Sequence, residues 1–165
     1  MPAVRNVLIL CTGNSARSVL AEALINHLGA GRWRAYSAGS QPTGRVNPHA
    51  LATLAHHGVA TTNARSKSWD EFALPNAPKM DLVVTVCDNA ANETCPIWPG
   101  APRVAHWGLE DPAAAQGDGA LVEAFGAAYA LIRKRVEAFV ALDFDALPAA
   151  QIEAELKKIG KINAM

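Results

Sequence analysis

A cysteine and an arginine with five residues between them form the part of this sequence best suited to chemistry. They bound the loop Cys11-Thr12-Gly13-Asn14-Ser15-Ala16-Arg17, and Ser18 follows it directly. A cysteine thiolate is a strong nucleophile, and the planar guanidinium of Arg17 can hold two oxygens of a tetrahedral oxyanion. The loop therefore predicts an enzyme in which Cys11 attacks an oxyanion that the loop, Arg17 and Ser18 bind.

The segments on either side of this loop can position it. The apolar run Val4–Leu10 predicts a buried parallel strand, and the apolar spacing over Arg17–Leu28 predicts a helix directly after the loop. Loop N–H groups and a helix N-terminus both attract anions, and together with Arg17 they predict a lowered pKa for Cys11. The alternative is a structural cysteine with an unrelated surface arginine, because this short pattern also arises by chance.

The rest of the chain alternates strand-like and helix-like segments, which predicts an α/β fold with a parallel sheet. Thr61–Lys79 is polar and predicts a loop with at most one helical turn. The remaining segments are strands at residues 32–38, 81–86 and 103–107, and helices at residues 47–57, 118–142 and 149–159. No composition shift divides the chain, so residues 1–165 are expected to form one domain.

Three of the four predicted strands end in residues suited to chemistry. Cys11 follows the first strand, Cys87 the third, and the segment that ends in Asp111 the fourth. Because the carboxyl ends of parallel strands meet at one sheet edge, we expect these residues to lie close together. The alternatives are a small buried cysteine at position 87 and, for Asp111 before Pro112, a simple turn.

The third cysteine, Cys95, lies eight positions after Cys87 in a polar segment. A mobile segment between two thiols suits thiol exchange, in which one sulfur must approach another. The alternative is that Cys87 and Cys95 are reduced cysteines without a role.

Charge and hydropathy exclude several classes of partner. Fifteen basic residues balance fifteen acidic ones, so neither nucleic acid nor a membrane is expected as a partner. No apolar run is long enough to span a bilayer or to form a signal peptide, which predicts a cytoplasmic protein. Three cysteines in that compartment do not indicate a structural disulfide framework.

The sequence Val-Leu-Ile-Leu-Cys-Thr-Gly-Asn-Ser-Ala-Arg-Ser around Cys11 resembles the low-molecular-weight protein tyrosine phosphatase superfamily. More narrowly, it is similar to the arsenate reductases built on that fold. The resemblance continues through residues 36–39, 83–87 and 106–112. It implies a three-layer α/β sandwich, in which a four-stranded parallel sheet has helices on both faces.

The resemblance also implies roles for the acid and for the cysteines. Asp111 would be the general acid that protonates the leaving group. In the three-cysteine arsenate reductases the first thiol attacks arsenate, the second resolves the adduct and releases arsenite, and the third takes over the disulfide. By position these are Cys11, Cys87 and Cys95. The spacing of the last two is one position longer than in the best-known members, which leaves both thioredoxin and glutathione with glutaredoxin open as reductants.

Some reductases of this type hold potassium near the loop with Asn, Glu, Ser and Asp side chains. Asn14, Glu22 and Ser37 match the first three, but Lys67 stands at the fourth position. A lysine ammonium can take the place of the cation, so neither bound potassium nor any cofactor is expected. The run Arg133–Arg135 is expected to be a solvated helix face. His49, His56 and His57 lie on or near one predicted helix, but they have no ligand spacing to a cysteine or a carboxylate and do not indicate a metal site.

Three functions remain open from the sequence. The first is an arsenate reductase with arsenate as substrate. The second is a phosphatase that forms a phosphocysteine on Cys11, although Ala113-Ala114-Ala115 offers no aromatic ring after Asp111-Pro112. The third is a non-catalytic oxyanion-binding module, which the joint presence of Cys11, Arg17 and Asp111 disfavours.

Overall fold

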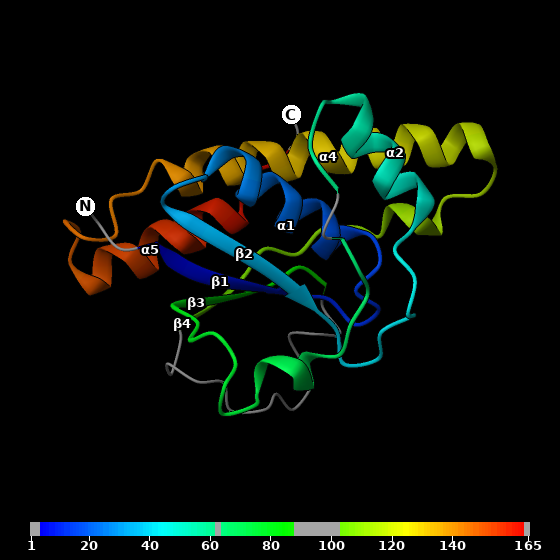
Figure 1. The fold of residues 1–165 in the computed structure, drawn as a ribbon. Helices are drawn as coiled ribbons and strands as arrows, with labels where there is room; N and C mark the ends of the chain where they lie inside the picture. Colours follow the sequence, from blue (N-terminus) through cyan, green and yellow to red (C-terminus); the bar gives the residue numbers. More distant parts are fainter. Residues whose placement is uncertain (1–3, 62–63, 88–102, 164–165) are drawn as a thin grey trace.

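The computed structural model describes residues 4–61, 64–87 and 103–163 of the chain, so Cys95 lies outside the described residues (Figure 1). A four-stranded parallel sheet forms the centre, with strand order β2-β1-β3-β4. The strands are β1 (Arg5–Leu10), β2 (Trp33–Ala38), β3 (Leu82–Thr85) and β4 (Arg103–His106). The predicted α/β class and the parallel sheet are confirmed.

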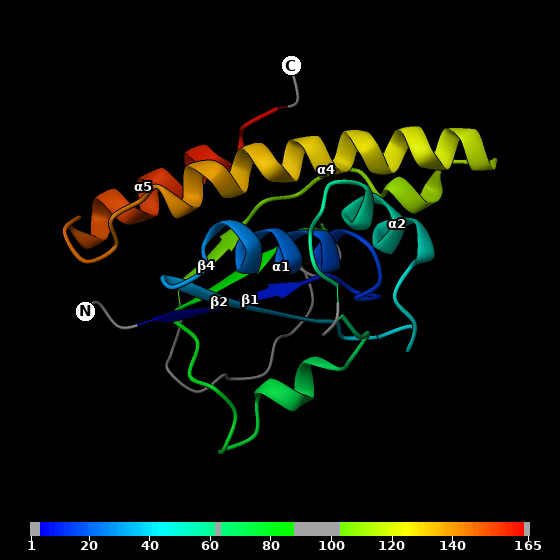
Figure 2. The same cartoon turned by 45° about the horizontal axis from the view of Figure 1, so that its top comes forward.

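Helices cover this sheet. The α-helices are α1 (Arg17–Leu28), α2 (Pro48–His56), α4 (Asp118–Val140) and α5 (Ala149–Gly160). Two short 3-10 helices are η1 (Trp69–Phe72) and η2 (Pro112–Ala114). Figure 2 shows α1 between the sheet and α4, with η1 on the opposite side of the sheet. The described residues form no helix that is both long and apolar enough to cross a membrane.

The local sequence explains where these helices begin. At α2, the Asn47 side chain accepts a hydrogen bond from the backbone N–H of His49 at 2.8 Å, and Pro48 occupies the first turn. At η1, the Ser68 hydroxyl accepts from the N–H of Asp70 at 3.1 Å. The helix α1 has no capping side chain, so the loop before it must be held by contacts from elsewhere in the fold.

Strand register brings the ends of all four strands level. Leu10, the last residue of β1, pairs with Ala38 of β2 and with Thr85 of β3. Thr85 in turn pairs with His106 of β4. The residues that follow each strand therefore emerge at one edge of the sheet, as the sequence predicts for Cys11, Cys87 and the segment leading to Asp111.

One expectation about α4 is wrong. Arg135 is only 4% exposed, whereas the run Arg133–Arg135 was expected to face solvent. Arg135 lies on the face of α4 that also carries Ile132, Val136 and Phe139, all of them buried. The helical spacing of these residues places Arg135 in the apolar stripe, where α5 and the segment after β4 cover it.

Candidate active site

Three carbonyl groups of the loop from Cys11 to Arg17 are bonded to the segment between β2 and α2. The carbonyls of Thr12, Gly13 and Ser15 accept hydrogen bonds from the backbone N–H groups of residues 41, 43 and 47 at 2.8–3.0 Å. In a trans peptide the following N–H points the opposite way. The N–H groups of Gly13, Asn14 and Ala16 are therefore directed away from these bonded carbonyls, and the N–H of Gly13 bonds to Cys11. Convergent loop N–H groups of this kind bind an anion.

Asn14 fixes the shape of this loop. Its φ of +46° is left-handed, a conformation that asparagine tolerates better than most residues. Its buried side-chain amide donates to the hydroxyls of Ser18 and Ser37, both at 2.9 Å. Its side-chain oxygen accepts from the backbone N–H of Lys67 at 2.9 Å. One side chain thus ties the loop to α1, to β2 and to the segment before η1.

Gly39, directly after β2, lies against the backbone of the loop. A Cβ atom at this position would come within 2.3 Å of the Thr12 carbonyl oxygen and 2.5 Å of the Cys11 carbonyl oxygen. Only glycine permits this approach. The sequence predicts a strand over residues 32–38 but gives no signal of this contact at the next residue.

Arg17 presents one edge of its guanidinium to the loop. Its Nη1 donates to the carbonyl of Leu109 at 2.9 Å, which anchors the side chain. Its Nε is buried and has no hydrogen-bond partner among the described residues. Its Nη2 lies 3.9 Å from a carboxylate oxygen of Asp111. The Nε–Nη2 edge therefore remains for two oxygens of an oxyanion, with the Asp111 carboxyl group next to it.

Asp111 also begins the short helix η2. One of its carboxylate oxygens accepts a hydrogen bond from the backbone N–H of Ala113 at 3.0 Å, while the other faces Arg17. The sequence offered two alternative roles for Asp111, a residue that starts a turn and a general acid. The structure shows that one side chain can do both. The hydrogen bond to Ala113 fixes the carboxyl group beside the loop.

Cys87 lies beside Cys11, and both side chains are buried. The backbone N–H of Thr12 donates to the sulfur of Cys87 at 3.3 Å. Hydrogen bonding with Cys87 and burial raise the pKa of Cys11, while the charge of Arg17 and the N–H of Gly13 lower it. The net direction is upward, so the lowered pKa expected from the loop alone is wrong for this arrangement. The sequence showed the cation and the helix but not the second sulfur.

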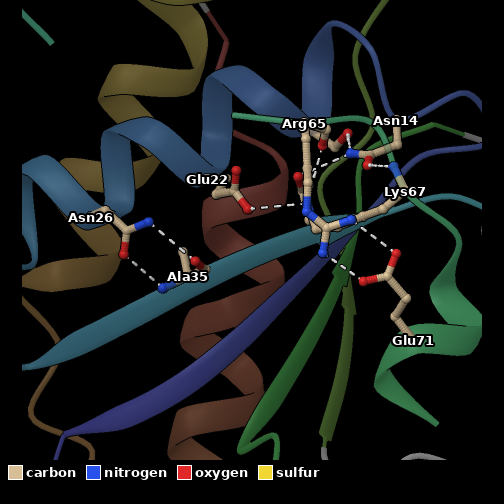
Figure 3. A network of polar contacts seen from close by, with 9 residues as sticks. Asn14, Glu22, Asn26, Ala35, Arg65, Lys67 and Glu71 are labelled. Carbon is tan, nitrogen blue, oxygen red and sulfur yellow. Dashed lines mark hydrogen bonds and ion pairs between the residues drawn. The ribbon is translucent and has the colours of Figure 1, made fainter. Parts of the chain in front are cut away.

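Behind the loop, Lys67 and Glu22 form a buried ion pair (Figure 3). The Lys67 ammonium lies 3.8 Å from a carboxylate oxygen of Glu22 and donates to the carbonyl of Arg65 at 3.1 Å. Burial raises the pKa of Glu22 and lowers that of Lys67, and each charge opposes the shift of the other. Because the ammonium already faces Glu22, these side chains do not fit a potassium ion.

The structure thus brings Cys11, Arg17, Cys87 and Asp111 together at one edge of the sheet. Cys95 lies outside the described residues. Sequence reasoning missed Arg135, whose spacing from Ile132 and Val136 was the available signal.

Residues 6–158 match the sequence model of the family described as low molecular weight phosphotyrosine protein phosphatase. The chain belongs to this family. A relative from Bacillus subtilis named arsenate reductase is 41% identical over 111 residues, which are 67% of this chain and 76% of that protein. A relative of the same name from Bacillus licheniformis is 40% identical over 114 residues, 68% of this chain and 78% of that protein.

Solved structures give the same grouping. One described as an arsenate reductase in the phosphate binding state is 29% identical, with a TM-score of 0.67, and covers 84% of this chain and 98% of its own. The arsenate reductase of Archaeoglobus fulgidus is 33% identical, with a TM-score of 0.62, over 82% of this chain and 99% of its own. A tyrosine phosphatase from Erwinia amylovora, 19% identical over 82% of this chain and 90% of its own, shares the fold with a TM-score of 0.63.

Proposed function

We propose that this chain reduces arsenate to arsenite through a relay of cysteine thiols. The observation that carries this function is the position of Cys87, whose sulfur lies beside Cys11 and accepts the N–H of Thr12 at 3.3 Å. A phosphatase needs one nucleophilic thiol, whereas a reductase needs a second thiol within reach of the first. The relatives named arsenate reductase support the same choice.

In the first step the Cys11 thiolate attacks the arsenic of arsenate, held by the loop N–H groups and by the free edge of Arg17. A sulfur–arsenic bond forms, and the hydroxyl oxygen of hydrogen arsenate takes a proton from Asp111 and leaves as water. The position of Asp111 near Arg17 supports this role, because an oxyanion on the free edge of Arg17 lies beside the carboxyl group.

In the second step the Cys87 thiolate attacks the sulfur of Cys11. A disulfide forms, the sulfur–arsenic bond breaks, and its electron pair stays on arsenic, which leaves as arsenite. The proton of Cys87 passes to solvent.

In the third step the Cys95 thiolate attacks the sulfur of Cys87, forms a Cys87–Cys95 disulfide and releases the Cys11 thiolate. An external dithiol reduces this disulfide and closes the cycle. A solved neighbour described as a thioredoxin-dependent arsenate reductase from Corynebacterium glutamicum, 26% identical with a TM-score of 0.57 over 81% of this chain and 62% of its own, favours thioredoxin over glutathione with glutaredoxin.

The test is arsenate-dependent oxidation of NADPH by wild type and by Cys87→Ser. Thioredoxin with its reductase is supplied in one arm, and glutathione with glutaredoxin and its reductase in the other. We expect turnover with thioredoxin and a loss of at least about 100-fold in Cys87→Ser, because no second thiol can release arsenite. Binding of inorganic phosphate to Cys87→Ser checks that the loop is intact. Full turnover by this variant would reject the relay.

Hydrolysis of phosphate monoesters is the second candidate, because the chain belongs to a phosphatase family and places Asp111 beside Arg17. The small side chains of η2 argue against tyrosine phosphate as the substrate, since they provide no ring to stack on it. We expect weak hydrolysis of an aryl phosphate that survives in Cys87→Ser. Aryl phosphate hydrolysis faster than arsenate reduction would reverse the assignment.

A further inference from the structure

The guanidinium of Arg135 lies behind the segment that carries Asp111. Its Nη1 donates to the carbonyls of Trp107 at 2.9 Å and of Gly108 at 3.0 Å. Its Nε and Nη2 both donate to the carbonyl of Ile162, at 3.2 Å and 3.0 Å. One side chain therefore fixes two successive carbonyls after β4 and ties them to the segment after α5.

The next carbonyl along the chain is also held by an arginine. The carbonyl of Leu109 accepts from Nη1 of Arg17 at 2.9 Å. Three successive carbonyls, at residues 107, 108 and 109, are thus each bonded to a guanidinium. Asp111 follows two residues later, so its distance from Arg17 depends on a backbone that Arg135 holds from the other side.

Arg135 is a costly side chain to bury. It is 4% exposed, and burial lowers its pKa. Within the described residues no carboxylate lies within ion-pair distance of it, so only carbonyl oxygens compensate for its lost hydration. An apolar side chain of similar length would fill the same space at a lower cost in desolvation. The benefit of an arginine here is the set of carbonyls that its planar fork can hold at once.

We propose that Arg135 is a positioning residue for the general acid, which it serves by fixing the backbone between β4 and Asp111. Because Asp111 acts as an acid only if the proposed function holds, this role of Arg135 rests on that function. The contact with Ile162 extends the arrangement to the C-terminal segment, so that the docking of α5 bears on the position of Asp111.

The first measurement compares Arg135→Met with Arg133→Met. Arg133 is the matched control, because it lies on the same helix, where its side chain donates to the Tyr129 hydroxyl and pairs with Glu137 of that helix. We expect Arg135→Met to lower kcat for arsenate about tenfold or more, with the Kd for inorganic phosphate changed less than about twofold. Arg133→Met should keep both values. An unchanged kcat in folded Arg135→Met would overturn the role.

The second measurement separates positioning from a general loss of structure. In an Asp111→Asn background the acid is absent, so adding Arg135→Met should lower kcat by less than about twofold. Losses that multiply in the double variant would show that Arg135 acts independently of Asp111, and the proposed role would fail.

A third readout does not depend on turnover. Hydrogen–deuterium exchange over residues 107–113 should be faster in Arg135→Met than in wild type, while residues 5–10 of β1 stay protected. Arg135→Lys keeps a buried cation, but a lysine cannot bond at once to the carbonyls after β4 and to the carbonyl of Ile162. It should therefore give an intermediate exchange rate over residues 107–113. This variant replaces Arg135→Met in the test if Arg135→Met does not fold. If wild type does not reduce arsenate, the proposed function fails, whereas unchanged exchange over residues 107–113 in a folded variant overturns the role of Arg135.

Discussion

The sulfur of Cys87 lies beside that of Cys11 and accepts the backbone N–H of Thr12 at 3.3 Å, so one buried cysteine influences the ionisation of the other, Cys11. In this arrangement the nucleophile of the loop is not an isolated thiol beside a cation. Its pKa results from opposing effects of Cys87, burial and Arg17, each of which a substitution can remove.

Cys87→Ala should lower the pKa of Cys11, because the hydrogen bond with Cys87 is the largest cause that raises it. The rate of iodoacetamide alkylation against pH, followed by mass spectrometry on the tryptic peptide of residues 6–17, reports this pKa without interference from the other cysteines. Arg17→Met should instead raise the pKa of Cys11, because it removes the positive charge that lowers this pKa. An unchanged or raised pKa in Cys87→Ala would contradict the contact.

Asp111→Asn should reduce kcat for arsenate by about 100-fold, the usual scale for loss of a general acid. Oxyanion binding should persist, because Arg17 and the loop N–H groups remain. Glu110→Gln is the matched control: the neighbouring carboxylate is exposed, and the variant should keep wild-type kcat. Equal losses in the two variants would remove the acid role from Asp111.

Lys67→Met should destabilise the fold by about 3 kcal/mol, because it leaves the buried Glu22 carboxylate without its ammonium. Urea unfolding measures this loss. Glu22→Gln combined with Lys67→Met should recover most of it, since no unpaired charge remains. Arg65→Met, which breaks the exposed pair with Glu71, should cost less than about 1 kcal/mol. A Lys67→Met variant as stable as Arg65→Met would show that the buried pair contributes nothing.

The same variant has a predictable pH dependence. Burial raises the pKa of Glu22 in the folded state, and Lys67 opposes that shift, so removing Lys67 raises this pKa further. A group whose folded pKa is raised contributes stability that is present below its unfolded pKa and is lost as the pH rises through the folded value. The gap in unfolding free energy between wild type and Lys67→Met should therefore widen from about pH 5 to about pH 8. A gap that narrows over this range would contradict the raised pKa of Glu22 and its dependence on Lys67.

Gly39→Ala should disturb the oxyanion loop, because the added Cβ would lie 2.3 Å from the Thr12 carbonyl oxygen. We expect weaker binding of inorganic phosphate, measured by calorimetry, and a loss of about 1–3 kcal/mol in unfolding free energy. The control is Gly126→Ala on α4, where a Cβ meets nothing within 4 Å and alanine favours the helix. Wild-type phosphate affinity in Gly39→Ala would show that the loop can move away from the added Cβ and still bind the anion.

Much of the fold and of the candidate site follows from the sequence by itself. The apolar run before Cys11 and the spacing after Arg17 are local patterns, and they predicted β1 and the bounds of α1. Parallel strands share a carboxyl edge, so the order of the segments sufficed to predict that Cys11, Cys87 and Asp111 gather there.

Only the tertiary structure decided how these residues act on one another. The distance from Cys87 to the loop, the approach of Gly39 to the Thr12 carbonyl and the burial of Arg135 each depend on segments far apart in the chain. Periodicity assigns a residue to a helix or a strand, but it does not specify which backbone will pack against it. The pKa of Cys11 depends on atoms that the fold brings within a few ångströms, so the sequence named the nucleophile while the structure determined its environment.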